Sequence, residues 1–454
     1  MPQNFPSATG TTTPPTVSML DPYTPGVGTP DLHIDHYDID LDYRIGPNRL
    51  AGRAQLTGRV LTDTTSIVLD LTGMRVTKAS VNGRKVRFTA RGKKLRLTTE
   101  PLVRNQPVRI DIAYAGNPQP AIGTWGDIGW EELEDGVLVA GQPIGASTWF
   151  PCNDHPSNKA KFRITVLTES EYTVVSNGEL TDKVRKAGRT AWTYRSTTPL
   201  ATYLATVQIG RYRQGPIAVP VGAAPSPVPL GLFAGQHWHT AALRLPVQHT
   251  MMNVFVDLFG PYPFDRYDVV VTDEELEIPL ESQPLSVLGP NHLGPEWESE
   301  RLIAHELAHQ WFGNSLTPKT WSDIWLNEGF ACYAEWLWSE ASGRMSAHDW
   351  AVAWYESLAV SPQDIVLGDP GGPGMFDDRV YKRGALCLHA LRVSLGDKVF
   401  FDGVREWTTR HRHGNVDTAD LIACFSKVAG RDVAEVIDPW LYGATLPQLP
   451  HQQV

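Results

Sequence analysis

The chain is poor in cysteine, in long apolar runs and in basic charge. Its 454 residues include four cysteines, which are far apart and lie among apolar residues: Cys152, Cys332, Cys387 and Cys424. We therefore expect buried free thiols in a reducing compartment, the cytoplasm, rather than a disulfide framework. No apolar run approaches the roughly 20 residues of a transmembrane helix. The formal net charge of −10 argues against nucleic acid or an anionic membrane as a partner.

The first thirty residues contain no basic residue and no apolar segment. They are rich in Thr, Pro and Gly, which predicts a disordered leader at 1–30 rather than a secretion signal. The whole chain, with 42% hydrophobic and 20% charged residues, has the composition of a globular protein. Its length suggests two or three domains.

Apolar residues recur at every second position in several segments between residues 31 and 209, a period typical of strands with one buried face. The dipeptides Asn82-Gly83 and Asn177-Gly178 favour hairpin turns. Many short strands predict an antiparallel, β-sandwich-like domain. The clearest alternating positions are Tyr37, Ile39, Leu41, Tyr43, Val108, Ile110, Ile112, Phe162, Ile164 and Val166.

The pattern changes after a proline-rich stretch at residues 215–229. Segments 240–259 and 298–311 have helical character, residues 267–271 look like one strand, and residues 417–441 look like closing helices. The expected fold class is therefore α+β with several domains. We predict a leader at 1–30, a β domain at 31–232 and a mostly α domain at 233–454.

One motif carries chemistry. Residues 305–309 read His-Glu-Leu-Ala-His, and Glu328 follows after eighteen intervening positions. Two histidines four residues apart share one face of a helix, with Cβ atoms about 5–6 Å apart, so both rings reach one ion. Residues 297–312 contain no Pro or Gly, and Gly313-Asn314 is a helix-ending signal, so we expect the motif on a helix. A second helical segment, residues 322–338, carries Glu328 near its start.

A zinc ion that activates water needs three protein ligands and an open position. We therefore predict one zinc ion per chain, bound by His305, His309 and Glu328. Glu306 lies beside the ligands and is the predicted general base, which takes the proton of the attacking water.

Three further segments resemble peptidase family M1, the gluzincin zinc aminopeptidases. Residues 325–330 read Trp-Leu-Asn-Glu-Gly-Phe around the third ligand, and residues 380–385 read Val-Tyr-Lys-Arg-Gly-Ala, similar to the segment with the family's catalytic tyrosine. Gln142 precedes Phe-Pro-Cys-Asn-Asp-His-Pro at 150–156, similar to the family stretch with an amine-contacting glutamine. The resemblance covers nearly everything after the leader.

The resemblance implies a thermolysin-like catalytic domain and an enzyme that removes N-terminal residues from short peptides with a free N-terminus. It implies that Tyr381 donates to the developing oxyanion and that Glu281 and Gln142 bind the α-amine of the substrate. The family's Gly-Ala-Met-Glu-Asn motif is altered here to Ile-Pro-Leu-Glu-Ser at residues 278–282. Since Pro279 cannot donate a hydrogen bond, only the role of the glutamate carries over.

Two more residues are candidates for holding the histidines. Ligating histidines usually donate the N–H of their other ring nitrogen to an acceptor, and Asn327 and Glu335 are the expected acceptors.

Larger members of the family continue into a C-terminal helical domain, so we expect this short form, which lacks it, to have a more open site. Two alternatives stay open: a zinc endopeptidase with relaxed N-terminal recognition, and a peptide-binding protein with structural zinc. The sequence does not indicate the oligomeric state.

Overall fold

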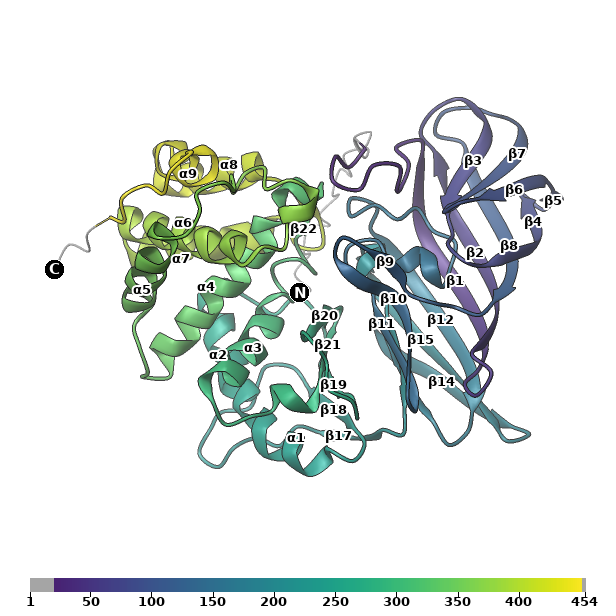
Figure 1. The fold of residues 1–454 in the computed structure, drawn as a ribbon, viewed down its shortest axis with the longest axis horizontal. Coiled ribbons are helices and arrows are strands. Elements are labelled where there is room, and N and C mark those ends of the chain that lie inside the picture. Colours follow the sequence, from purple (N-terminus) through teal and green to yellow (C-terminus); the bar gives the residue numbers. More distant parts are fainter. Residues whose placement is uncertain (1–19, 451–454) are drawn as a thin grey trace, which may run out of the picture.

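Strands dominate the first half of the protein and helices the second (Figure 1). The structure is a computed structural model and describes residues 20–450. The two regions lie side by side, with the short strand β20 (Leu280–Ser282) on the side of the helical region that faces the sheets. No helix within residues 20–450 combines the length and the apolar character needed to cross a bilayer.

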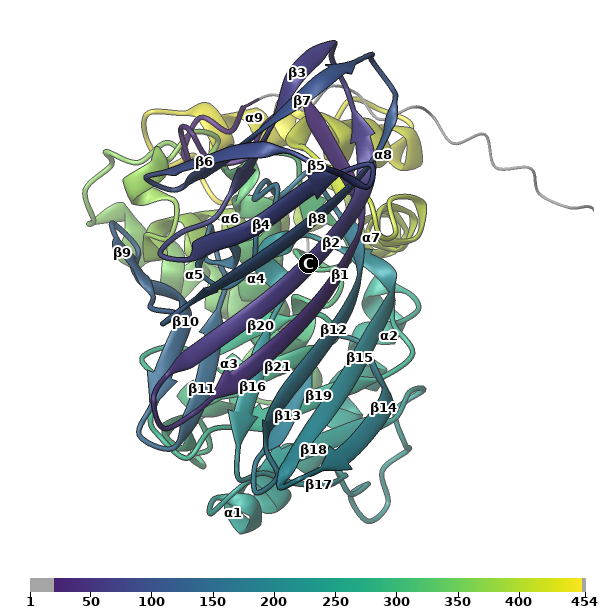
Figure 2. The same cartoon turned by 90° about the vertical axis from the view of Figure 1, so that its right-hand side faces the viewer.

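An eight-stranded sheet forms the outer layer of the N-terminal region (Figure 2). All neighbouring strands are antiparallel except β1 and β12, which are parallel, so the predicted antiparallel arrangement holds for every pairing but this one. In sheet order the strands are β14 (Glu179–Lys186), β15 (Arg189–Leu200), β12 (Ala160–Glu169), β1 (Leu32–Arg44), β2 (Arg49–Val60), β8 (Pro107–Gly116), β4 (Arg75–Val81) and β5 (Arg84–Lys85).

Two smaller sheets complete this region. Tyr43 on β1 meets Trp130 on β10 edge to face, with ring centroids 4.9 Å apart, so the inner faces of two sheets share an aromatic core. This packing confirms the predicted β-rich N-terminal region. The five-stranded sheet is β13 (Thr173–Ser176), β16 (Val207–Gly210), β11 (Gly136–Ala140), β10 (Gly126–Leu133) and β9 (Ala121–Gly123); the three-stranded sheet is β3 (Thr64–Asp70), β7 (Lys94–Leu102) and β6 (Arg87–Arg91).

The helical region begins with a sheet of its own. Its strands, in order, are β17 (Arg213–Pro216), β18 (Leu230–Ala234), β19 (Tyr267–Val271), β21 (Leu285–Leu288) and β20. The strand predicted at residues 267–271 is confirmed as β19, which is buried along its whole length. Strands β18, β19 and β21 run parallel, whereas β20 is an antiparallel edge strand.

The central helix is α4 (Trp325–Ala341), in which every residue from Trp325 to Ser339 is buried. It crosses α6 at two glycines: a Cβ added to Gly329 would lie 3.0 Å from the Cα of Gly384, so a side chain there would push the two helices apart. The other helices are α1 (Trp238–Arg244), α2 (Gln248–Phe259), α3 (Trp297–Ala308), α5 (Ala347–Ala359), α6 (Asp378–Leu395), α7 (Asp397–Arg410), α8 (Thr418–Ala429) and α9 (Ala434–Tyr442).

The predicted domain boundary between residues 232 and 233 is misplaced. It falls inside β18, which is hydrogen-bonded to β17 on one side and to β19 on the other. The proline-rich stretch at 215–229 is therefore mostly a loop between two paired strands, and the sheet of the helical region already begins at Arg213. Proline suits loops within a domain as well as joins between domains.

Two other predictions need correction. Of the leader predicted at 1–30, residues 1–19 lie outside the described residues, but residues 20–30 are not disordered. The Asp21 carboxylate accepts a hydrogen bond from the Trp321 main-chain nitrogen at 2.6 Å, and the Tyr23 hydroxyl bonds to Asp369. Asn177-Gly178 is not a hairpin turn, because the strands on either side, β13 and β14, belong to different sheets.

Candidate metal centre

The two histidines of the motif lie on one face at the end of α3. Glu298 and Glu300 lie in the first turn of this helix, where their negative charge stabilises the helix by interacting with the positive end of its dipole. The helix ends at Ala308, four residues before the end of the segment expected to be helical. His309 keeps helical geometry, with φ −56° and ψ −23°, and its main-chain nitrogen bonds to the His305 carbonyl. Both imidazole rings therefore extend from the same face of the helix.

Glu328, in the first turn of α4, completes a buried group of three ligand atoms. Its Oε2 lies 3.4 Å from the Nε2 of His305 and 3.4 Å from the Nε2 of His309, and the three ligand atoms all lie within 4.8 Å of one another. Ligand atoms about 2.0–2.1 Å from a tetrahedral zinc ion are roughly 3.3–3.4 Å apart, so these distances fit zinc. Within residues 20–450, no other group of three His, Cys, Asp or Glu side chains is arranged to hold a metal.

The ring nitrogens that face away from this group are also held. The Nδ1 of His305 donates to the Oε1 of Glu335 at 2.8 Å, and Arg301 donates to the other oxygen of Glu335 at 3.2 Å. Burial raises the pKa of Glu335, but the charge of Lys382 and the hydrogen bond from His305 outweigh burial and lower it to about 2. A carboxylate in this place leaves the Nε2 lone pair of His305 free for a metal.

Asn327 does not have the expected contact with His309. The Nδ1 of His309 instead donates to the carbonyl oxygen of Phe312 at 3.0 Å, because the chain turns back over the ring directly after the helix. Asn327 lies against Gly313 of the same turn. A main-chain acceptor leaves no signal in the sequence, so the search for a side-chain acceptor could not find Phe312.

Glu306 is buried beside the ligands. Its Oε2 is shielded from solvent and has no hydrogen-bond partner among the described residues. Burial raises the pKa of Glu306 to about 8, against the lowering effect of His309. Burying a carboxylate oxygen without a hydrogen-bond partner costs free energy of folding. Such a group therefore indicates a site for a ligand or a reaction.

Tyr381, near the start of α6, faces the same group. Its ring is stacked on that of His305, with centroids 6.0 Å apart and an angle of 20° between the planes. Burial raises the pKa of the Tyr381 hydroxyl well above 10, so this hydroxyl remains a hydrogen-bond donor at physiological pH. The close approach of Gly329 and Gly384 lets α4 and α6 pack together, and Tyr381 lies within the electrostatic reach of Glu328.

Glu281 and Gln142 come from different regions of the chain, and each lies in a segment near Tyr203. The loop after β11 packs Gly141 against the Tyr203 main chain, and the Tyr203 hydroxyl lies within the electrostatic reach of Glu281 and Glu328. The Oε1 of Glu281 and the Nε2 of Gln142 are both shielded and have no hydrogen-bond partner within residues 20–450. Burial raises the pKa of Glu281. A buried polar group without a partner suits a polar or charged ligand, and both residues meet that condition.

Two residues outside every predicted motif, Tyr203 and Lys159, hold the turn after α3. The Tyr203 hydroxyl donates to the Gly313 carbonyl at 3.0 Å, and the buried amine of Lys159 donates to the carbonyls of Asn314 at 2.9 Å and Ser315 at 2.8 Å. Both side chains belong to the N-terminal region. From the sequence, Tyr203 resembles an ordinary core residue and Lys159 an ordinary surface lysine, so neither is marked as part of the site.

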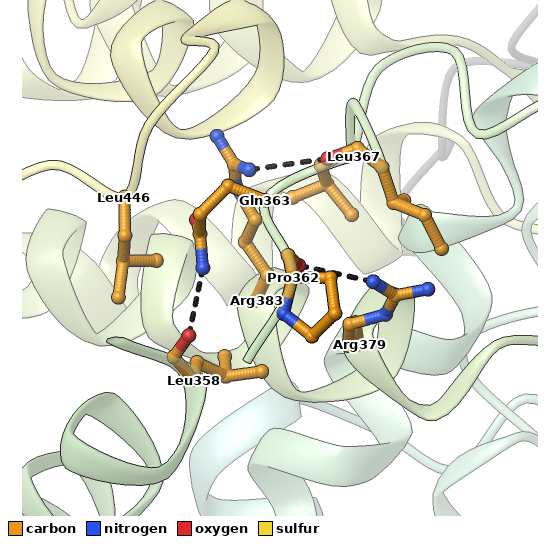
Figure 3. A pocket seen from close by; sticks show the side chains of 8 residues that line it. Leu358, Pro362, Gln363, Leu367, Arg379, Arg383 and Leu446 are labelled. Atoms are coloured by element: carbon orange, nitrogen blue, oxygen red, sulfur yellow. Dashed lines mark hydrogen bonds between the residues drawn. The ribbon is translucent and has the colours of Figure 1, made fainter. Parts of the chain in front are cut away.

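Two cavities lie outside the ligand group. One, of about 10 Å³, is bordered by Gln363, Arg379 and Arg383, whose side chains bond to main-chain carbonyls around it (Figure 3). It has room for about one water molecule and cannot hold a peptide. The other, of about 180 Å³, is lined by four tryptophans, Glu298, Arg301 and Glu335, and so borders the carboxylate that holds His305.

A β-rich region followed by a helical region with this buried ligand group is the architecture of a metallopeptidase. Residues 33–204 match the model of the peptidase M1 N-terminal domain, and residues 244–440 match the peptidase family M1 domain. An M1 zinc metallopeptidase from Deinococcus radiodurans, solved as a mutant with a bound Tyr-Ser-Ala substrate, superimposes with a TM-score of 0.86 at 31% identity, over 95% of this chain and 99% of the other. The chain belongs to peptidase family M1.

Curated relatives share the family but are longer. A leucyl aminopeptidase of Saccharolobus solfataricus is 24% identical over 93% of this chain and 54% of its own length. An alanine/arginine aminopeptidase of Saccharomyces cerevisiae is 29% identical over 66% of this chain and 37% of its own length. This chain thus spans about half the length of these relatives or less.

Proposed function

We propose that the protein is a zinc-dependent aminopeptidase that removes N-terminal residues from short peptides. The observation that carries the proposal is the buried group of His305, His309 and Glu328 with ligand distances that suit zinc, next to an unpaired Glu306. The names of its relatives support the reaction: zinc metallopeptidase for the Deinococcus structure and aminopeptidase for the Saccharolobus protein.

Each residue of the site has a part in this reaction. Zinc, when bound by the three ligands, supplies Lewis-acid chemistry and acidifies water. Glu306 takes the proton of the attacking water and delivers it to the leaving amine. The Tyr381 hydroxyl donates to the carbonyl oxygen as negative charge develops on it. Glu281, together with Gln142, binds the protonated α-amine, so that cleavage follows the first residue.

The physiological setting is part of the proposal. The substrates are peptides with a free N-terminus, with no role for nucleic acid or membrane. Cys152, Cys332, Cys387 and Cys424 are all buried and unpaired, which suits a reducing compartment, and we assign the protein to the cytoplasm.

Endopeptidase activity is the second candidate, because the segment before Glu281 lacks small residues. Ile278 is 64% exposed beside the strand, and Pro279 has no N–H to offer a substrate. A scaffold with structural zinc is less favoured, since it has no use for a buried, unpaired Glu306 or for Tyr381 stacked on a ligand.

The test compares a leucyl fluorogenic substrate with its N-acetyl counterpart. We expect turnover of the free-amine substrate, its loss with a chelator and its return with added zinc. The charge-assisted bond from the α-amine to the Glu281 carboxylate corresponds to a factor of roughly 10–150 in turnover. The acetylated substrate, which cannot form this bond, should therefore be hydrolysed about 10²-fold more slowly. Glu281→Ala should lose this preference and keep its zinc, whereas Glu277→Ala, at an exposed carboxylate four residues earlier, should change neither.

Equal cleavage of both substrates would favour the endopeptidase. Full zinc occupancy without turnover of either substrate would favour the scaffold.

A further inference from the structure

The strand that carries Glu281 has little support of its own. β20 is three residues long, lies at the edge of its sheet and pairs only with β21, through Leu280, Glu281 and Ser282. Short edge strands are held weakly by their ladder alone. The distance between the Glu281 carboxylate and the ligand group therefore depends on contacts from outside the sheet.

Those contacts converge on the next residue, Ser282. Its carbonyl oxygen accepts two side-chain hydrogen bonds, from the Nε2 of Gln310 at 3.0 Å and from the Nδ2 of Asn314 at 2.8 Å. Both donors are fully buried and follow the ligand His309 by one and five residues. Two donors use both lone pairs of the carbonyl and tie the strand directly to the end of the metal-binding helix.

The orientation of the two amides follows from the chemistry of their partner. A carbonyl oxygen only accepts, so each amide must present its NH₂ group to Ser282. The amide oxygens of Gln310 and Asn314 have no partner within residues 20–450. The two bonds to Ser282 are therefore the polar contacts that give these buried side chains a fixed place.

The N-terminal region holds the same residue from the other side. The Ser282 hydroxyl donates to the Leu204 carbonyl at 2.6 Å and accepts from the Nδ2 of Asn177 at 3.1 Å. The same Nδ2 bonds to the Gln283 carbonyl at 2.7 Å. Ser282 is thus the point at which the β region, the edge strand and the metal-binding helix meet, and Figure 1 shows β20 between the sheets and the helices.

We propose that Gln310 and Asn314 are positioning residues that set the distance from Glu281 to the metal ligands, and thereby fix cleavage after the first residue of a peptide. This inference rests on the proposed aminopeptidase function. Neighbouring residues of a strand point to opposite faces, so a bond to the Ser282 carbonyl fixes the backbone while Glu281 remains free for the amine. Loosening the strand should weaken amine recognition without removing a metal ligand.

The variants remove one donor at a time and then both. Gln310→Met keeps the length of the side chain without its N–H group, and Asn314→Ala removes the second donor. Gln208→Met is the matched control: the Gln208 side chain is also buried and donates to Thr206 at 2.7 Å and the Val139 carbonyl at 3.3 Å, within the N-terminal region. Each variant is assayed for zinc content, KM, kcat and the ratio of leucyl to N-acetyl-leucyl turnover. That ratio is independent of the fraction of folded protein.

The double variant should raise KM for the leucyl substrate by about 10-fold or more, toward the roughly 10–150-fold limit set by losing the amine contact. Its turnover ratio should fall by a similar factor, while zinc content stays stoichiometric and kcat changes less than KM. Each single variant should lie between wild type and the double variant, and Gln208→Met should leave KM and the ratio unchanged.

Three outcomes would overturn the inference. If the double variant keeps wild-type KM and turnover ratio while Glu281→Ala loses them, positioning by the two amides is refuted and the aminopeptidase function stands. If Glu281→Ala itself keeps the free-amine preference, the proposed amine site fails. If the double variant loses its zinc, the two amides hold the metal-binding helix rather than the strand.

Discussion

Lys159 is a buried lysine whose removal should change how stability depends on pH. From its position just before β12, its amine reaches the turn after the metal-binding helix, where it donates to the Asn314 and Ser315 carbonyls and lies 3.5 Å from the Gly414 carbonyl. A neutral amine has two N–H donors, enough for the two close carbonyls. An ammonium group has three and needs a third acceptor at good distance.

Burial lowers the pKa of Lys159 from 10.5 to about 7. Between these two values the unfolded chain binds a proton that the folded protein does not, so the folded state gains stability as pH rises through this window. At about 1.4 kcal/mol for each pH unit, the gain from this one group is roughly 3–4 kcal/mol between pH 7 and pH 10. Lys159→Met removes the titrating group and with it this gain.

The assay is urea unfolding of wild type and Lys159→Met at several pH values from 7 to 10. The difference in free energy of unfolding between them should shift in favour of wild type by about 3–4 kcal/mol across this range. His413 does not interfere, because burial and then the charge of Lys159 lower its pKa to about 4. Lys161→Met, at an exposed position two residues further along the chain, should give a constant difference. A constant difference for Lys159→Met as well would refute the reasoning, since the amine would then stay protonated in the fold.

Three substitutions in the metal centre separate the roles of its residues. Glu306→Gln should keep stoichiometric zinc and lose roughly 10²-fold or more in turnover, because it removes the base and no ligand; near-zero zinc in this variant would contradict that role. Glu328→Ala should lose zinc in equilibrium dialysis, and wild-type zinc affinity would disprove the third ligand. Tyr381→Phe should lower kcat by about 10²–10³ with unchanged zinc, and an unchanged kcat would remove Tyr381 from the reaction.

Features set by short-range geometry could be predicted from the sequence. Two histidines four apart on a helix must share a face, and the structure brings His305 and His309 to the same oxygen of Glu328. The segment at 267–271, which ends in three valines, is a strand with the predicted bounds. The acceptor for His305 was also within reach, since Glu335 lies two helical turns after Glu328 on the same face of α4.

Features set by contacts between distant segments could not be predicted. The proline-rich stretch resembles a domain join because proline composition does not reveal that β17 and β18 pair across it. The acceptor for His309 is a main-chain carbonyl, which every residue possesses. Asn177, Gln310 and Asn314 meet at Ser282 from positions 105, 28 and 32 residues away along the chain, and no local pattern encodes that encounter.

The central claim is that this zinc site cleaves after the first residue of a peptide. The most direct measurement follows, by mass spectrometry over time, the products of an unstructured peptide of about ten residues with the zinc-loaded protein, with either a free or an acetylated N-terminus. The account predicts a ladder of products that each lack one more N-terminal residue from the free peptide, and an intact acetylated peptide over the same time. Internal fragments from both peptides, or no cleavage of either one, would contradict it.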